Sequence, residues 1–286
     1  MNNPLVTVAI PFYNAEEFLD QAILSVCNQT YSNIEILLLD DGSTDNSLSI
    51  AQSLALKDKR IKVHSDGENK GLIFRLNQSV SMSESEYYAR MDSDDIMHPL
   101  RIQKQLEHLE NNPSVDILGT SFYSIDNENR IRECVEISYV HDYNNLFILH
   151  PSIIGKTEWF KNNPYNPRFE RIEDLELWLR TVSKYKIRTL SIPLMYYREF
   201  GVPTLKKYLK TQKSAIKIYT SYKKYNLAFE RAIKSIFLTL IKSLVCICCF
   251  LINKMDVLVS LRRRNSISFD YNIAINDMNI AIHKLE

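Results

Sequence analysis

Three carboxylates crowd into four residues of this chain, because Asp92, Asp94 and Asp95 all lie in the segment DSDD. Like charges this close repel one another, so a folded protein either leaves such a group in water or brings a positive partner to it. The first alternative is an ordinary solvated turn. The second is a binding site whose chemistry uses positive charge, and the elements that carry the segment help to distinguish the two.

Polar segments follow three of the predicted strands. Apolar runs at residues 6–10 and 34–40 lead into PFYN and DDGS, and the run EYYARMD leads into DSDD. Predicted strands alternate with predicted helices at a spacing typical of βαβ units, which indicates an α/β fold around a mostly parallel central sheet. Ligands of such sheets bind beyond the carboxyl ends of the strands, so the three segments together predict a nucleotide-binding site.

Local signals outline further elements. Pro11 is expected to end the first strand, and Asn14, followed by Glu17, has the pattern of a helix N-cap. Pro99 is expected to open a helix that runs through Asn111. The segment FYSIDNENRIRE has the composition of a hairpin.

A second acidic pair, Glu173 and Asp174, lies at the start of a predicted amphipathic helix. Leu175, Leu179 and Val182 form the apolar face of this helix. Acidic residues in a first turn also favour the helix dipole by about 0.3–1 kcal/mol, so a purely structural role is the alternative to a chemical one.

The charge is divided unevenly along the chain. Residues 1–200 carry 20 basic and 29 acidic side chains, a balance of −9, whereas residues 201–286 carry 15 and 5, a balance of +10. We therefore expect two parts: a catalytic domain at 1–200, with nucleotide binding in 1–115 and acceptor binding in 116–200, and a basic helical extension at 201–286.

The five cysteines do not form a metal-binding pattern. No CxxC pair has a matching second pair, and three of the thiols cluster in an apolar run, so we expect reduced cysteines in a cytosolic protein. The N-terminal segment MNNPLVTVAIPFYN lacks the basic and apolar regions of a signal peptide.

The chain resembles a family 2 glycosyltransferase of the GT-A fold. The resemblance rests on VAIPFYNAEEFLDQAILSVCNQTYSNIEILLLDDGSTDNS, NKGLIFRLNQSV, ARMDSDDIMHPLRIQKQ, HPSII and IEDLELWLR, which follow one another in family order over residues 6–198, about two thirds of the chain. It implies a Rossmann-like, mostly parallel central sheet flanked by helices, here with a C-terminal helical extension.

The resemblance also implies a nucleotide-sugar site. In the family the aspartates that match Asp92 and Asp94 serve the ribose and a metal, Mn²⁺ or Mg²⁺, which stabilises the departing diphosphate. By the same resemblance Pro11 and Tyr13 flank the nucleobase, Asp41 accepts a hydrogen bond from its imide N–H, and Arg75 lies near the base and phosphates. Arg75 has a plain surface role as its alternative.

The implied general base is Asp174, which would take the proton of the acceptor hydroxyl while that oxygen attacks the anomeric carbon with inversion. Glu173 is expected to point elsewhere, toward the acceptor. His150 is placed near the metal or the donor phosphates, with a structural histidine as the alternative. Trp178 is a candidate sugar-stacking platform, although a core position is favoured.

The C-terminal part contains an apolar stretch at residues 235–252, after a segment rich in lysine and tyrosine. Basic residues with aromatics suggest nucleic acid, but the apolar stretch argues against it. Arg231, Ser235, Thr239, Lys242 and Cys246 share one helical stripe, which favours a helix lying in a membrane surface over one that spans the bilayer. The alternative is a helical hairpin that packs on the catalytic domain or on a second subunit in a homodimer.

These observations predict an inverting, metal-dependent glycosyltransferase. We expect it to move a sugar from a nucleotide-sugar donor, a UDP-sugar by preference, to a glycan or lipid-linked glycan, in bacterial surface polysaccharide synthesis at the inner face of the cell membrane. Two other classes stay open: a metal-dependent phosphohydrolase of haloacid-dehalogenase type, which DSDDI resembles weakly, and a non-catalytic nucleotide-binding membrane adaptor.

Overall fold

The computed structural model describes residues 3–137, 139–143, 145–199, 204–225, 227–254 and 265–285. Its centre is a curved sheet with strand order β10-β7-β6-β8-β4-β1-β2-β3. Strand β9 also pairs with β6, and the short strand β5 pairs with β9. The strands are β1 Val6–Phe12, β2 Ile34–Asp40, β3 Ile61–Ser65, β4 Tyr87–Arg90, β5 Ile96–Met97, β6 Ile117–Ile125, β7 Ile131–Val135, β8 Ile154–Lys156, β9 Ile187–Arg198 and β10 Ser266–Ile267.

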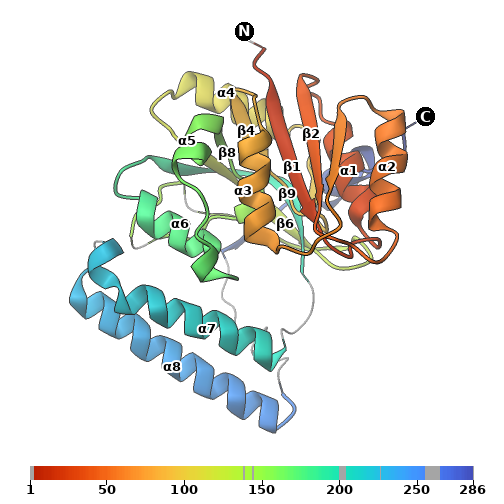
Figure 1. Cartoon of the computed structure of the whole chain (residues 1–286). Coiled ribbons are helices and arrows are strands. Elements are labelled where there is room, and N and C mark those ends of the chain that lie inside the picture. Colours follow the sequence, from red (N-terminus) through yellow and green to blue (C-terminus); the bar gives the residue numbers. More distant parts are fainter. Residues whose placement is uncertain are drawn as a thin grey trace.

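Helices cover both faces of this sheet (Figure 1). They are α1 Leu19–Cys27, α2 Ser47–Lys57, α3 Leu72–Met82, α4 Arg101–Asn111, α5 Thr157–Asn162, α6 Glu173–Thr181, α7 Leu205–Thr220, α8 Phe229–Leu251 and α10 Tyr271–Ala281, with short 3₁₀ turns η1 His150–Ser152, η2 Pro167–Phe169 and η3 Tyr222–Tyr225. Alternate residues of β1 enter different cores: Val8 packs in the core that includes α1 and α4, and Ala9 in the core that includes α3 and α5. The period of two in a buried strand explains this division.

The parallel arrangement that the sequence predicts is present in the N-terminal half of the sheet. Strands β3, β2, β1 and β4 are parallel neighbours. The other half is mixed, because β8 runs antiparallel to β4 and β6, and the predicted hairpin of β6 and β7 is antiparallel. The prediction of a mostly parallel sheet therefore holds for the strands that carry the three polar segments, and not for the whole sheet.

Two local predictions in the first βα unit are wrong. Strand β1 continues through Pro11 to Phe12, paired with β2 on one side. Asn14 does not cap a helix, because α1 begins only at Leu19. Instead Asn14 has a positive φ of 47°, and its Oδ1 accepts a hydrogen bond of 2.8 Å from the backbone N–H of Thr44. This hydrogen bond connects the loop that follows β1 with the loop that follows β2.

The C-terminal residues form two structures. Helices α7 and α8 make an antiparallel hairpin beside α6, where Ala215, Ile218, Tyr225 and Leu227 share a core with Leu179 (Figure 1). Strand β10 and helix α10 return to the catalytic body. There the Asn28 side chain donates hydrogen bonds to the carbonyl oxygens of Ala281 and His283 at 2.9 and 2.8 Å. The predicted boundary between residues 200 and 201 lies outside the described residues.

Helix α8 contains nearly all of the predicted apolar stretch, and the residues that it buries have small side chains. Its buried residues are Ala232, Thr239, Cys246 and Cys249, and large apolar side chains such as Phe237 and Leu244 are 62% exposed. The polar stripe predicted from the sequence thus packs in part against α7, because small side chains let two helices approach closely. By length and composition α8 could cross a membrane, and only 11% of its most apolar window is buried.

Candidate active site

The loop between β4 and β5 gathers the three carboxylates of DSDD. Oxygens of Asp92, Asp94 and Asp95 lie within 4.8 Å of one another. Burial, and then the charge of Asp92, raises the pKa of Asp94 to about 7, and burial with the charge of Asp94 raises the pKa of Asp95 well above its usual range. The structure therefore brings the three carboxyl groups together, which is the arrangement that a cation would stabilise.

Strand β9 holds this loop in place. The backbone N–H of Arg198 donates to Asp95 Oδ1 at 2.8 Å, and Arg198 Nε donates to the carbonyl oxygen of Asp94 at 2.7 Å. Asp95 Oδ2 is buried and has no hydrogen-bond partner among the described residues. Asp95 therefore shapes the loop, while Asp92 and Asp94, which are partly exposed, face the cavities.

A cavity of about 260 Å³ brings together the residues predicted to bind the nucleotide. Pro11, Tyr13, Asp41, Arg75, Asp92 and Asp94 all line it. Tyr13 is 49% exposed and offers its ring to a ligand, whereas the others lie deeper. They meet because β1, β2 and β4 are parallel neighbours whose carboxyl ends lie at one edge of the sheet.

Within this cavity Arg75 holds Asp41. Arg75 is fully buried, and Nε donates to Asp41 Oδ1 at 2.9 Å. Its other N–H groups are bonded to the carboxylate of Asp66, to the Gln78 side chain and to the carbonyl oxygen of Glu68. Arg75 lines the smaller cavity, and a plain surface role does not fit because the side chain is fully buried. Its donors are used within the protein. It positions the carboxylate of Asp41 beside the backbone N–H of Gly71, which donates to Asp41 Oδ2 at 3.0 Å.

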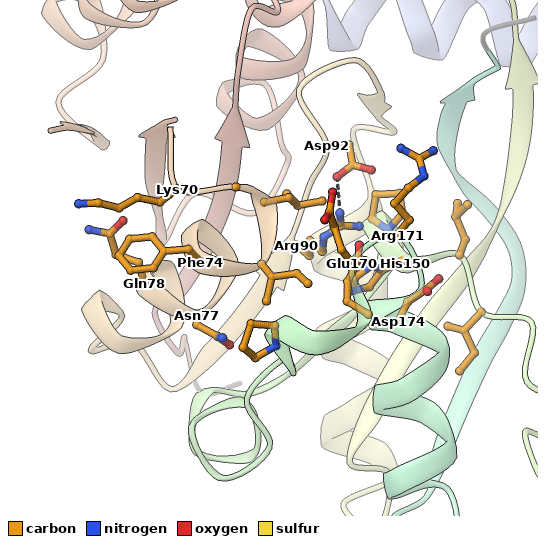
Figure 2. Close-up of a pocket in the computed structure, with 18 of the residues that line it drawn as sticks. Lys70, Phe74, Asn77, Gln78, Arg90, Asp92, His150, Glu170, Arg171 and Asp174 are labelled. Carbon is orange, nitrogen blue, oxygen red and sulfur yellow. Dashed lines mark ion pairs between the residues drawn. The ribbon is translucent and has the colours of Figure 1, made fainter. Parts of the chain in front are cut away.

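A second cavity, of about 1260 Å³, adjoins the first. Its walls are α3, residues 147–151 and residues 167–174, and Leu72, Arg90 and Asp92 line both cavities. Figure 2 shows Asp92, Arg90, His150 and Asp174 at one end of this cavity and Lys70, Phe74 and Gln78 at the other. Residues of DSDD and of IEDLELWLR, which are far apart in sequence, therefore line the same cavity.

Asp174 lies at the N-terminus of α6 and lines this larger cavity. Its Oδ1 accepts a hydrogen bond of 2.7 Å from the backbone N–H of Leu175, which fixes the carboxylate in the first turn. Burial raises the pKa of Asp174, and the charge of Asp92 acts in the same direction, while the charge of Arg90 opposes it. A carboxylate held in this way is a better proton acceptor than one in water.

Three neighbours of Asp174 differ in what they can do. Glu173 lines the cavity, and its Oε2 is buried without a hydrogen-bond partner among the described residues. His150 lines the cavity but stands outside the carboxylate cluster, and its Nε2 is 2.8 Å from the hydroxyl of Tyr165. Trp178 is 1% exposed and packs in the core, so it is not a platform for stacking sugars.

Arg90 is the residue of this site that the sequence reasoning missed. It ends β4, is 2% exposed, and its Nη2 forms an ion pair of 2.7 Å with Asp92 Oδ1. The available signal was a basic residue at the end of a buried strand directly before an acidic segment. A charged side chain at that position needs partners, and the acidic segment supplies one.

Sequence comparisons with known proteins identify one protein family. The model of the family described as Glycosyl transferase family 2 matches residues 7–171. The uncharacterized glycosyltransferase MJ1057 of Methanocaldococcus jannaschii is 31% identical over 232 residues, which cover 78% of this chain and 79% of that protein. An uncharacterized glycosyltransferase of Haemophilus influenzae is 44% identical over 119 residues, or 42% of this chain and only 37% of that protein.

Solved structures share the fold. Staphylococcus aureus TarS 1–349 in complex with UDP-GlcNAc has a TM-score of 0.64 at 18% identity, over 82% of this chain and 71% of that one. The mannosyltransferase PcManGT of Pyrobaculum calidifontis, in complex with GDP-Man and Mn²⁺, has a TM-score of 0.60 at 13% identity, over 99% of this chain and 86% of that one. At these identities the likeness concerns the fold alone, and it confirms the expected GT-A architecture.

Proposed function

Because this chain belongs to glycosyl transferase family 2 and is a glycosyltransferase, we propose that it moves a sugar from a UDP-sugar to a hydroxyl group of a lipid-linked glycan, with inversion at the anomeric carbon. The observation that carries the proposal is the junction of the two cavities at Arg90 and Asp92. One cavity suits a nucleotide beside clustered carboxylates, and the other suits an acceptor beside the partly buried carboxylate of Asp174.

The nucleotide occupies the smaller cavity. Pro11 and Tyr13 flank the base, and Asp41 Oδ2, which accepts one backbone hydrogen bond from Gly71, takes a second from an imide N–H. Arg75 contributes by holding Asp41 in place. The imide of uracil offers the N–H that this arrangement needs, and that complementarity is the reason for preferring UDP.

A divalent cation, Mn²⁺ or Mg²⁺, fits the carboxylates Asp92 and Asp94. Their hard oxygen donors, within 4.8 Å of one another and of those of Asp95, suit such an ion. Burial and the charge of Asp92 raise the pKa of Asp94 to about 7, and a bound cation would offset that charge. When bound, the ion would neutralise negative charge that develops on the departing diphosphate. His150 is left out of the ligand set because its Nε2 engages Tyr165.

Asp174 acts as the general base. It takes the proton of the acceptor hydroxyl while that oxygen attacks the anomeric carbon at the junction of the cavities. The acceptor approaches from the larger cavity and the nucleotide leaves into the smaller one, so attack and departure occur on opposite faces of the sugar. Opposite faces mean inversion of configuration.

Binding experiments test the donor site directly. UDP titrated into the full chain should bind at least tenfold more tightly with Mn²⁺ present, because the ion and the diphosphate stabilise each other. Asp94→Asn should remove this enhancement, while Asp20→Asn on α1, a change of the same kind outside both cavities, should keep it. Independent binding of UDP and Mn²⁺ would contradict the proposal.

The membrane is the proposed location of the acceptor. Helix α8 exposes large apolar side chains along its outer face, among them Phe237, Leu240 and Leu244, and α7 beside it exposes five lysines. An apolar face flanked by cations suits a surface with anionic headgroups, so we propose a peripheral position at the cytoplasmic face of the membrane. We retain residues 1–200 as the catalytic domain and 201–286 as the extension, of which α7 and α8 are the membrane-facing part.

Vesicles with and without anionic lipid test this location. Each large apolar side chain that enters lipid contributes roughly 1.5–3 kcal/mol, so the double variant Phe237→Ser, Leu244→Ser should weaken vesicle binding at least about 100-fold. Leu56→Ser, at an exposed position of α2, is the matched control and should bind as the unmodified chain does. A stable dimer in solution that the double variant dissociates, without vesicle binding, would favour a second subunit as the partner of α8.

A further inference from the structure

Glu176 is a buried carboxylate that the proposed reaction does not use. It lies in the first turn of α6, two residues after Asp174, and its side chain is 0% exposed. Nε of Arg180, one turn further along α6, donates to both carboxylate oxygens at 3.2 and 3.3 Å. The hydroxyl of Tyr225 donates to Oε1 at 3.2 Å from outside the helix. A carboxylate in the interior needs such partners, and here one of them belongs to a different part of the chain.

Tyr225 ends the turn η3 between α7 and α8 and is 1% exposed. It belongs to a small apolar core that α6 shares with the α7–α8 hairpin. The buried members of this core are Phe169, Ile172 and Leu179 from the chain around Asp174, and Ala215, Ile218, Tyr225 and Leu227 from the hairpin. Apolar side chains before and after Asp174 therefore pack on the hairpin, and the hydrogen bond between Tyr225 and Glu176 joins the same two parts.

Helix α7 also contacts the residues directly before α6. Nζ of Lys210 lies 2.8 Å from Glu170 Oε2. Arg171 Nε donates to Thr211 Oγ1 at 3.3 Å. Arg171 has a φ of 73°, a conformation that is uncommon outside glycine and persists where surrounding contacts fix it. Since Glu170 and Arg171 also line the larger cavity, the hairpin supports the wall from which Asp174 acts.

The start of α6 has no side-chain cap of its own. Its N-cap residue is Ile172, which has no polar side-chain group to offer the free N–H groups of the first turn. The position of this turn therefore depends on contacts with other elements. Leu177 and Trp178 anchor one face of α6 in the core of the catalytic body, and the hairpin holds residues of another face.

We propose that the α7–α8 hairpin positions Asp174 for transfer through Tyr225 and Glu176, so that it is part of the catalytic machinery as well as a membrane-facing element. This inference rests on the proposed function, because it takes Asp174 to be the base. Tyr225 and Glu176 line neither cavity, so they act as positioning residues. A base must stay within hydrogen-bond reach of the hydroxyl that it deprotonates, and a displacement of about 1 Å is enough to lower the rate up to about 100-fold.

Donor hydrolysis measures the role of Tyr225 with water as the acceptor. The water oxygen bonds to the anomeric carbon, its proton goes to Asp174, and UDP leaves with the electrons of the bond that breaks. The probes are UDP-glucose and UDP-N-acetylglucosamine, each with Mn²⁺ and the full chain. Tyr225→Phe should lower the rate at saturating donor at least about fivefold, because the base shifts. It should leave KM for the donor within about twofold, because other elements form the nucleotide cavity.

Hydrogen exchange shows whether the same change loosens the segment around the base. Amides of residues 169–181 should exchange at least about threefold faster in Tyr225→Phe. Tyr31→Phe is the matched control, because it removes a tyrosine hydroxyl that donates to the carbonyl oxygen of Pro4 at 2.6 Å, outside both cavities. It should leave exchange of this segment and hydrolysis unchanged. Ile218→Ala removes buried apolar packing instead of a hydroxyl and should act as Tyr225→Phe does, with UDP binding retained.

The outcomes separate this inference from the proposed function. Unchanged exchange in Tyr225→Phe and Ile218→Ala would overturn the inference, and so would faster exchange with an unchanged rate of hydrolysis. The donor and the base would stand in either case. If Asp174→Asn hydrolyses the donor as fast as the unmodified chain, the base of the proposed function falls, and this inference with it. Glu158→Gln, at an exposed position of α5, is the charge-matched control for Asp174→Asn.

Discussion

Replacement of Asp174 by asparagine is the sharpest test of the assigned chemistry. Asparagine has the same shape as aspartate, and its Oδ1 can still accept the hydrogen bond from the backbone N–H of Leu175. The change therefore removes the negative charge and the proton acceptor while it keeps the geometry of the first turn of α6. Activity, donor binding and stability should respond in three different ways.

The size of each response follows from where Asp174 lies. General base catalysis contributes about 10²–10⁴ in rate, so the rate of transfer at saturating substrate should fall by a factor in that range. UDP affinity should change less than twofold, because Asp174 lines the larger cavity and not the nucleotide cavity. Thermal stability should stay equal or rise, because burial raises the pKa of Asp174 and so disfavours its charged form in the folded protein.

The assay measures transfer from a UDP-sugar, UDP binding by calorimetry and thermal unfolding on the same preparations, with Glu158→Gln as control. Transfer by the unmodified enzyme should fall at acid pH with an apparent pKa above the ordinary aspartate value, since the base must be ionised to act. Retained turnover in Asp174→Asn would refute the assignment. Lost turnover with equally lost UDP binding would show that the change damaged the donor site instead.

Three further predictions concern the metal loop and the scaffold. Without metal, the free energy of unfolding should decrease as pH rises from about 4 to about 7, because Asp94 ionises near 3.8 in the unfolded chain and only near 7 in the folded one. Thermal unfolding measures this trend, and Mn²⁺ should reverse it. Asn28→Ala should lower the free energy of unfolding by about 1 kcal/mol and Tm by roughly 2–4 °C, because the carbonyl groups at the end of α10 lose the side-chain donor of Asn28. An unchanged Tm would contradict this prediction. Gly155→Ala should cost roughly 1–3 kcal/mol in urea denaturation, because a Cβ there would lie 2.6 Å from the carbonyl oxygen of Asp116, and full stability would show that β8 can shift.

Much of the site could be predicted because its signals are local. Strand β2 spans residues 34–40 as predicted, and an apolar, β-branched run bounded by turn residues has few other conformations available. Pro11, Tyr13, Asp41 and Asp94 line one cavity since each lies at or beyond the carboxyl end of a strand of the parallel set. Parallel neighbours necessarily bring their carboxyl ends to one edge, so sequence order alone places such residues together.

Other features depend on partners that local patterns do not reveal. Arg75 lines the cavity predicted for the nucleotide, but the sequence does not show that Asp66 and Glu68 occupy its guanidinium donors. The polar stripe of α8 was predicted from helical period alone, but α7 packs beside α8, and Thr239 and Cys246 of the stripe are buried. In each case the decisive contact comes from another element, and a helical period specifies a face without saying what covers it.

The sequence by itself indicated the alternation of strands and helices in the N-terminal half, the parallel strands there, and the acidic segments that follow them. Only the tertiary structure decided that Asp174 opens into the same space as Asp92, that buried Arg90 stands between the two cavities, and that α10 returns to cap the catalytic body. The reason is physical. Turn signals and the period of apolar residues depend on a few neighbouring residues, so they can be recognised in the sequence. Burial and cavity shape depend on elements that are far apart in the sequence and meet only when the chain is packed.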